Sequence, residues 1–571
     1  MLSDPSPSLV SRLDADRLLA IAVGLAFVGV GAVAGLVTAT GQPIPIALVV
    51  GGALGLLLLS FPGVAVWIVL VGVLAISGQL FMHYPALTKL GWLFSLLGFF
   101  LTGMAMLYPA LGREHPRFRA PLFVPLMVLF MVWALATMLF PAGTFAEAYT
   151  GAKRYFQYFG LMFILAVYPF SAASVRGWLV FLGVVQVLHL GFVVYQRFVL
   201  VPRYEALVGT IPGMIPMDMV VGAFEGTLGA GGSSSTMAMM CLAVIAFVLA
   251  AWRERLVAVP AALLGLLVAL LPLGLGETNV VIVWFPIAMA AVYMDVLRRN
   301  PLAFAFGGLV VLLLVAGFMY LYAVFSASDG RGLSFAQRIT ETFAYNFGRA
   351  GYYGGGSVNR TSAIPFWFQQ HGLADPIGTV FGHGIGSSYG GGGRVELTGH
   401  MHDAYRGKAI GLISFSTILW DLGLLGFGLY CAAFASAALC AMRLAARAAP
   451  GFDRAFCRAL FAMMAMHLVL PMYSDLSLQT PSQEVLQSLT FGLIAWRWRR
   501  GEPIAPSSVG SVGSVGSVGS ATPAWAAVAS ATVAAASPRG PGAGAAASGE
   551  PSRRRERPRA SPDQWANPTE R

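Results

Sequence analysis

Long apolar runs separated by short polar turns fill most of this 571-residue chain, and they constrain its fold more than any other feature. Hydrophobic residues make up 57% of the sequence and charged residues only 11%, against roughly a quarter charged in a soluble domain. The runs have the roughly 17–25 residues of a membrane-crossing helix, whereas a strand of a membrane β-barrel needs only about 10. Because a backbone inside lipid must satisfy its own hydrogen bonds, the sequence predicts an all-α, polytopic transmembrane helical bundle.

The apolar runs divide into about fourteen predicted spans, within a range of roughly 12 to 14. They cover 18–39, 46–60, 63–82, 87–109, 121–140, 155–172, 177–200, 236–252, 257–274, 279–297, 302–325, 410–442, 455–473 and 483–498. The run 410–442 is too long for one upright helix, and we expect it to begin along the membrane surface before Asp421. His189 and His467 lie inside spans, where hydrogen bonding between helices is their expected role.

Positive charge in the turns predicts which side of the membrane each turn faces. With the N-terminus inside, the basic turns 112–120, 253–255, 298–299 and 443–458 all fall in the cytoplasm, while the alternate turns carry few Lys or Arg. The segments 141–154, 201–235 and 326–408 then fall outside. The net charge of +11 follows this sidedness, so we expect no nucleic-acid partner.

Four regions follow from this topology. We expect an N-terminal transmembrane bundle (1–325, about eleven spans), a large periplasmic loop (326–408), C-terminal transmembrane spans (409–500) and a cytoplasmic tail (501–571). The tail is rich in Ser, Gly, Ala and Pro, a composition typical of disordered segments.

The large loop gathers cationic and imidazole side chains between nearly uncharged runs. They are Arg331, Arg338, Arg349, Arg360, Arg394, Arg406, Lys408, His371, His383, His400 and His402. A guanidinium fork matches phosphate oxygens, and an imidazole titrates near pH 6.5, so it accepts or donates a proton readily. This set fits a lipid-diphosphate sugar donor, in which arginines stabilise the departing diphosphate and a histidine activates an acceptor hydroxyl.

Such a transfer needs no cofactor and no metal ion. The two-residue spacing of His400 and His402 points their side chains apart on a strand or a helix, and no third ligand accompanies them in the sequence. We therefore expect a metal-independent glycosyltransferase without a metal site.

The order of motifs in the loop resembles that of the O-antigen ligase and O-antigen polymerase superfamily. Arg360-Thr361 precedes Trp367, a Gly-x-Gly-x-Gly turn follows at 382–386, then His402-Asp403, then Asp421 before Gly-Leu-Leu-Gly. The family pattern is Gly/Ser-Arg-x-x-x-Trp, Gly-x-Gly, His-Asn and Glu-x-Gly-Leu-x-Gly. This chain departs from it in three ways: Asp403 replaces Asn, Asp421 replaces Glu, and Arg360 stands seven rather than four residues before the tryptophan.

The resemblance implies a fold like that of the C-type glycosyltransferases, with the loop capping a cavity open to lipid. It also implies roles for individual residues: His402 as catalytic base and Arg360 as the diphosphate contact. The predicted substrate-binding residues are Arg338, Arg203, His400, Asp403 and Trp367. Arg203 is included for its external position alone.

The predicted function is polymerisation of undecaprenyl-pyrophosphate-linked repeats of O-antigen, capsule or exopolysaccharide at the periplasmic face of the bacterial inner membrane. The expected partners are this carrier-linked glycan, a glycan or lipid acceptor, membrane lipids and other polysaccharide assembly proteins. Three alternatives stay open: a ligase that moves the finished glycan to lipid A core or protein, a flippase or transporter of lipid-linked oligosaccharides, and a structural subunit of a secretion complex. A transporter would show inverted repeats, and none is evident in the sequence.

Overall fold

The computed structural model describes residues 58, 61–84, 87, 91–110, 120–139, 143–207, 219–226, 233–276, 278, 280–309, 313, 317, 336–337, 340, 357–372, 374–390 and 398–501. The predicted spans 18–39 and most of 46–60, the tail beyond residue 501, and Arg338 lie outside these residues.

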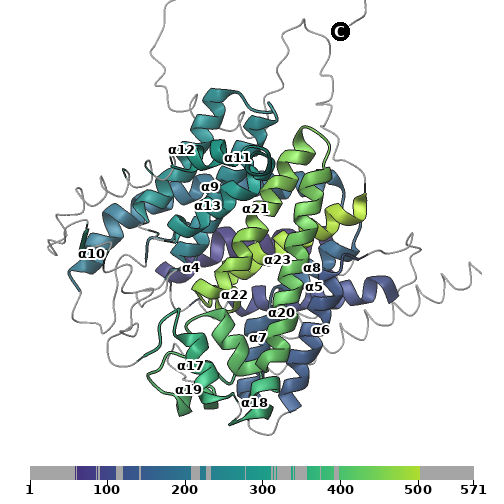
Figure 1. Cartoon of the computed structure of the whole chain (residues 1–571), viewed down its shortest axis with the longest axis vertical. Helices are drawn as coiled ribbons and strands as arrows, with labels where there is room; N and C mark the ends of the chain where they lie inside the picture. Colours follow the sequence, from purple (N-terminus) through teal and green to yellow (C-terminus); the bar gives the residue numbers. More distant parts are fainter. Residues whose placement is uncertain are drawn as a thin grey trace, which may run out of the picture. The chain divides into compact units, whose positions relative to one another are not determined.

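All regular structure in the described residues is helical, with no strand among them (Figure 1). The first half holds α3 (Pro62–Val71), the π-helical turn η1 (Gly72–Ser77), α4 (Gly78–His83), α5 (Gly91–Ala110), α6 (Phe123–Ala136), η3 (Thr137–Leu139), α7 (Phe145–Phe156), α8 (Phe159–Val167), α9 (Ala172–Tyr195), η4 (Gln196–Leu200) and α10 (Val201–Glu205). The rest comprises α11 (Ser234–Arg253), α12 (Val259–Leu275), α13 (Val281–Val292), α14 (Met294–Arg299), α17 (Ala363–Gln370), α18 (Pro376–Phe381), α19 (His400–Ala404), α20 (Ser414–Arg447), α21 (Phe452–Tyr473), α22 (Leu476–Gln479) and α23 (Pro481–Arg500).

Five helices in the described part of the chain are long and apolar enough to cross a membrane. They are Pro62–Leu80, Ala172–Glu205, Ser234–Arg253, Ser414–Arg447 and Phe452–Tyr473. Four shorter helices are also apolar: Leu93–Tyr108, Phe123–Leu139, Val259–Leu275 and Val281–Val292. Each overlaps one predicted span, so the all-α class is confirmed there and the apolar helices indicate a membrane protein. The count of fourteen spans stays a prediction.

Two predicted spans form buried central helices. Every residue of α8 is buried, and so is α23 from Ser482 to Arg497. The two helices pack against each other, and α8 also packs on α5. Gly160 permits that second contact, because a Cβ at this position would lie 2.1 Å from the carbonyl oxygen of Gly98. Their apolar surface is therefore covered by protein.

Turns predicted to share the cytoplasmic side contact one another. The Arg253 guanidinium pairs with both carboxylate oxygens of Asp295. Arg458 lies 3.0 Å from Glu254 and 3.6 Å from Asp295, so the turns near 254, 295 and 451 meet in one ion-pair network. Arg497 binds Asp453 nearby through two hydrogen bonds of 2.7 and 2.8 Å.

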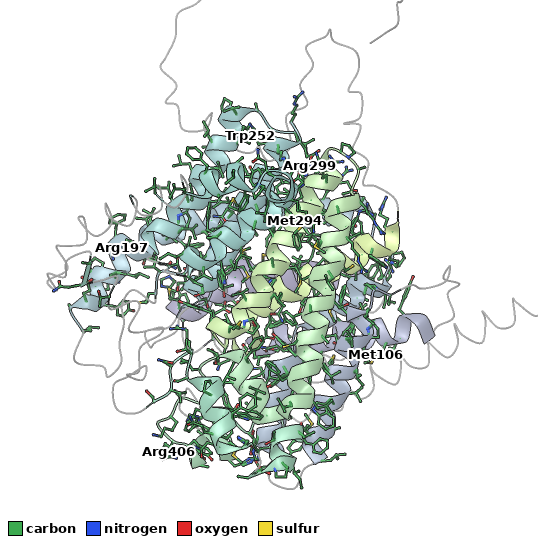
Figure 2. All side chains as sticks on the ribbon, in the orientation of Figure 1. Met106, Arg197, Trp252, Met294, Arg299 and Arg406 are labelled. Atoms are coloured by element: carbon green, nitrogen blue, oxygen red, sulfur yellow. The ribbon has the colours of Figure 1, made fainter. Side chains whose placement is uncertain are left out.

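Segments predicted to lie outside also meet one another. His400 binds Glu147 at 2.7 Å, and Ser482 donates two hydrogen bonds to Glu225, at 2.9 and 3.0 Å. Figure 2 shows Arg406 at the opposite end of the described helices from Arg299 and Trp252. The turns near 254 and 299 thus lie apart from the loop segment near 406, while the sidedness of all the turns stays a prediction.

Two histidines inside the predicted spans make hydrogen-bond contacts. His467 on α21 lies 3.2 Å from Gln483 and 3.5 Å from Thr490, both on α23, so it joins two helices as expected. His189 on α9 accepts the backbone N–H of Ala223 at 2.9 Å. Ala223 is not in a helix, so His189 joins α9 to a connecting segment and not to a second helix.

The long helix α20 is interrupted at Gly423, where φ is 65° and ψ is −167°. The interruption removes the helical partners of the preceding carbonyl groups. Three donors replace them: the N–H of His383 reaches Trp420 O (3.0 Å), that of Gly384 reaches Asp421 O (2.9 Å), and the Trp133 indole reaches Leu422 O (3.1 Å). The loop therefore binds α20 at this break. Residues Ile418 to Gly423 are buried in the protein, so Asp421 does not face lipid, as expected. The surface-lying start of this segment stays a prediction.

Gly423→Ala is expected to destabilise the protein by roughly 1–3 kcal/mol, because this backbone conformation is open to glycine alone. A Cβ would also lie 2.5 Å from Gly382 N and from Val380 O. Gly428→Ala on the same helix is the matched control, since a Cβ there meets nothing within 4 Å. Thermal unfolding of the purified protein in detergent measures the difference. Equal midpoints for the two variants would contradict the close approach of loop and helix.

Candidate functional site

One face of α7 carries three residues that contact the loop. The helix begins with a capping box: the Thr144 hydroxyl accepts the N–H of Glu147, and the Glu147 carboxylate accepts the N–H of Thr144. Glu147, Gly151 and Arg154 follow at spacings of four and three residues, which places them on one side of the helix. A Cβ on Gly151 would lie 2.6 Å from Gly386 N, so glycine allows the loop backbone to approach α7.

The Asn359-Arg360-Thr361 motif is a side-chain-stabilised turn at the start of α17. The Asn359 amide oxygen accepts the N–H groups of Thr361 (3.1 Å) and Ser362 (2.8 Å). The turn directs Arg360 to the end of α21, where its Nε donates to Tyr473 O at 2.7 Å. Its guanidinium carbon lies 4.4 Å from the centroid of the Tyr473 ring. Arg360 therefore joins the loop to the membrane bundle.

The glycine-rich turn is fixed by the buried carboxylate of Asp421. One oxygen accepts Ser388 N (2.8 Å) and Ser387 Oγ (2.9 Å), and the other accepts Gly386 N and Tyr155 Oη, both at 3.1 Å. Asp421 is 0% exposed, so these four donors take the place of water. The carboxylate predicted from sequence to avoid lipid thus holds the loop against the bundle.

Helix α19 contacts this turn and carries two of the predicted site histidines, His400 and His402. The N–H of His402 donates to Ser387 O at 3.1 Å, and the His402 ring packs over Gly390. The His400 imidazole binds Glu147 through Nδ1 at 2.7 Å, and this hydrogen bond raises the pKa of His400. Burial lowers the pKa of His402. The two histidines therefore favour different protonation states: His400 the cation and His402 the neutral base.

Arg154 brings a second buried guanidinium to the same region. Its Nη2 lies 3.8 Å from Asp475, and its guanidinium carbon lies 4.6 Å from the centroid of the Tyr389 ring. The side chain is 8% exposed, and its Nε has no hydrogen-bond partner. Burial raises the pKa of Asp475 to about 7, so this carboxyl group is a weak counter-charge near neutral pH. Asp421 and Glu484 also interact with this guanidinium, so Arg154 lies among three buried or partly buried carboxyl groups.

Arg154 and Arg360 meet at one short turn. Arg360 binds the carbonyl of Tyr473 and Arg154 pairs with Asp475, two residues further on. Tyr389, beneath Arg154, precedes Gly390, over which His402 packs. Contacts and short stretches of chain therefore connect both guanidinium groups to the histidine segment. The same region thus holds two fork-shaped donors and an imidazole that can accept a proton.

Other predicted residues lie elsewhere. Trp367 is 0% exposed in a core cluster with Ile410, Leu419 and Trp420, and its contact with substrate stays a prediction. Asp403 is held at the surface by Arg406 (3.1 Å). Arg203 is exposed on α10, which Figure 1 shows apart from α17 and α19.

The sequence alone did not assign several side chains to this site. The Thr144–Glu147 spacing marks a helix start but says nothing of the His400 contact, because 253 residues separate the partners. Lys153-Arg154 marks a helix end near the interface, and only the fold shows the buried guanidinium. The four-residue spacing of His371 and Asp375 was the signal for a further cluster completed by His383.

The comparisons with known proteins leave this site without a precedent. No family model, no curated protein and no solved structure matches the chain. The resemblance to the O-antigen ligase and polymerase superfamily therefore depends on the residues of this chain and their order alone.

Proposed function

We propose that this protein is an inner-membrane glycosyltransferase that polymerises undecaprenyl-pyrophosphate-linked oligosaccharide repeats at the periplasmic face. The observation that carries the proposal is the meeting of Arg360 and Arg154 at the turn after α21, joined by contacts to the histidine segment of α19. All of these segments belong to the set predicted to lie outside. Cytoplasmic nucleotide sugars do not reach that side, whereas a lipid-linked donor does.

The reaction requires little beyond these side chains. The acceptor hydroxyl oxygen forms a bond to the anomeric carbon of the donor sugar, and the bond from that carbon to the diphosphate oxygen breaks. Undecaprenyl diphosphate leaves, and the guanidinium groups of Arg360 and Arg154 stabilise its negative charge. The hydroxyl proton passes to an imidazole, for which neutral His402 is suited.

His400 has a different role in this proposal. Its contact with Glu147 fixes the ring and favours the imidazolium form, which adds positive charge beside the departing diphosphate. A polymerase and a ligase share this donor chemistry. The preference for a polymerase comes from the long external loop predicted from the sequence.

Deletion of the gene is expected to leave single repeat units on their carrier or acceptor, with no long chains. Gel separation of extracted glycans and mass spectrometry of the carrier lipids measure this outcome. Long carrier-linked chains would identify a ligase instead. Repeat units that stay inaccessible to a periplasmic glycosidase would identify a flippase, and unchanged polymer would contradict all three assignments.

A further inference from the structure

Three loop side chains that the proposed transfer does not use converge beside α18. The Nε2 atoms of His371 and His383 lie 2.7 Å apart, and His383 Nε2 lies 3.7 Å from Oδ2 of Asp375. The three ligand-type atoms all lie within 4.8 Å of one another. Two imidazole nitrogens and a carboxylate oxygen form a ligand set that zinc and related first-row ions prefer.

Neighbouring backbone groups orient these ligands. His371 Nδ1 lies 3.0 Å from Trp367 O, so it carries the proton and leaves the Nε2 lone pair facing His383. Oδ1 of Asp375 accepts Gly378 N at 2.9 Å, which leaves Oδ2 as the oxygen nearest the imidazoles. Hydrogen bonds of this kind on the far side of each ligand are the usual support of a metal site.

The surroundings exclude water from one side of the cluster. His371 is 3% exposed and stacks on the ring of Trp367, with centroids 4.8 Å apart. The ring of Trp420 lies nearly perpendicular to that of His371, with centroids 4.6 Å apart. Asp375 stays partly exposed, with 42% of its side chain accessible. A metal ion would therefore be bound between one buried and one partly buried imidazole, with an open position toward solvent.

We propose that His371, Asp375 and His383 bind one divalent transition-metal ion of the zinc type, which braces the loop. The ligands come from the end of α17, the start of α18 and the turn that follows α18. That turn supplies the N–H groups that cap the break in α20. Around the ion, the two nitrogens would separate from 2.7 Å to about 3.3 Å, as tetrahedral bonds of about 2.0–2.1 Å require. None of the three ligands takes part in the proposed transfer, so the site stands whether or not that transfer is correct.

The experiment uses the full-length protein, purified in detergent and stripped with a chelator. Titration with Co²⁺ is expected to produce visible absorption bands that saturate at one ion per chain and disappear when Zn²⁺ is added. Calorimetric titration with Zn²⁺ gives the affinity. His371→Ala and His383→Ala are each expected to weaken binding by more than about 100-fold, beyond the effect of losing a supporting hydrogen bond. His83→Ala, which changes an exposed histidine on α4, is the matched control and should bind as the parent does.

A second measurement guards against variants that fail to fold. Zn²⁺ is expected to raise the thermal unfolding midpoint of the parent and of His83→Ala, but not that of Asp375→Ala, because a ligand of the folded state stabilises it. Asp375 is partly exposed, so its removal should leave the apo protein folded. Absence of saturable binding, or binding unchanged in both histidine variants, would show that the two imidazoles are joined by a simple hydrogen bond.

Discussion

Arg360→Ala and His402→Ala are each expected to abolish polymer formation while the protein still reaches the membrane. Removal of a general base typically costs about 10²–10⁴-fold in rate. Loss of a donor to developing negative charge costs about 10²–10³-fold. Complementation of a deletion strain, with glycan gels beside immunoblots of membrane fractions, measures polymer and protein together. Arg406→Ala is the matched control, since this loop arginine is 77% exposed and forms an ion pair only with the surface carboxylate of Asp403 among the residues that the structure describes.

The contact of Arg360 with Tyr473 makes a purely structural role the competing explanation. Arg360→Lys separates the two, because lysine keeps the charge but cannot form the two-pronged contact with diphosphate. A catalytic role predicts a folded Arg360→Lys protein with strongly reduced polymer. If Arg360→Ala lowered the thermal midpoint and Arg360→Lys restored both stability and polymer, the residue would be a clamp between loop and bundle.

The sequence predicted the helical class well, because it depends on local composition. Apolar runs are visible without tertiary information, so α11 and α21 lie close to the expected 236–252 and 455–473. The sidedness of the turns stays a prediction. Burial of α8 was not predictable in the same way, because this helix is as apolar as a lipid-facing helix and only packing against α5 and α23 distinguishes it. Helix α23 differs, since it carries Gln483, Glu484 and Gln487, polar side chains that fit a protein interior better than lipid.

The candidate site was predictable only in part. Arg360 and His402 stand in a recognisable order of motifs, so the sequence could single them out. Glu147 and Arg154 belong to a different segment, and their contacts depend on α7 turning one face toward the loop. The burial of Trp367 was not predictable for a related reason: position in a motif does not reveal whether a side chain faces the core.

Asp421→Ala is expected to be the most destabilising of the loop-contacting substitutions and to abolish polymer formation as well. It would leave four buried donors without an acceptor: Gly386 N, Ser388 N, Ser387 Oγ and Tyr155 Oη. Each unpaired buried donor costs about 1–3 kcal/mol, so the total is at least about 4 kcal/mol. Thermal or denaturant unfolding in detergent measures the loss. Activity falls too, because the turn held by Asp421 places Ser387 O, the acceptor of the His402 N–H.

Asp421→Asn tests whether hydrogen bonding carries this effect. The asparagine side chain has the same shape, but only one of its two terminal atoms accepts hydrogen bonds, so about half of the donors stay satisfied. We expect a midpoint between those of the parent and Asp421→Ala, with polymer reduced in the same order. Asp403→Ala removes an exposed loop carboxylate and should leave the midpoint unchanged. If Asp421→Ala unfolded at the parent temperature yet made no polymer, the carboxylate would act on substrate directly. We expect a lower unfolding temperature instead, because Asp421 is buried and accepts four hydrogen bonds. Asp421 is then a positioning residue, whose loss lowers stability before it affects the reaction.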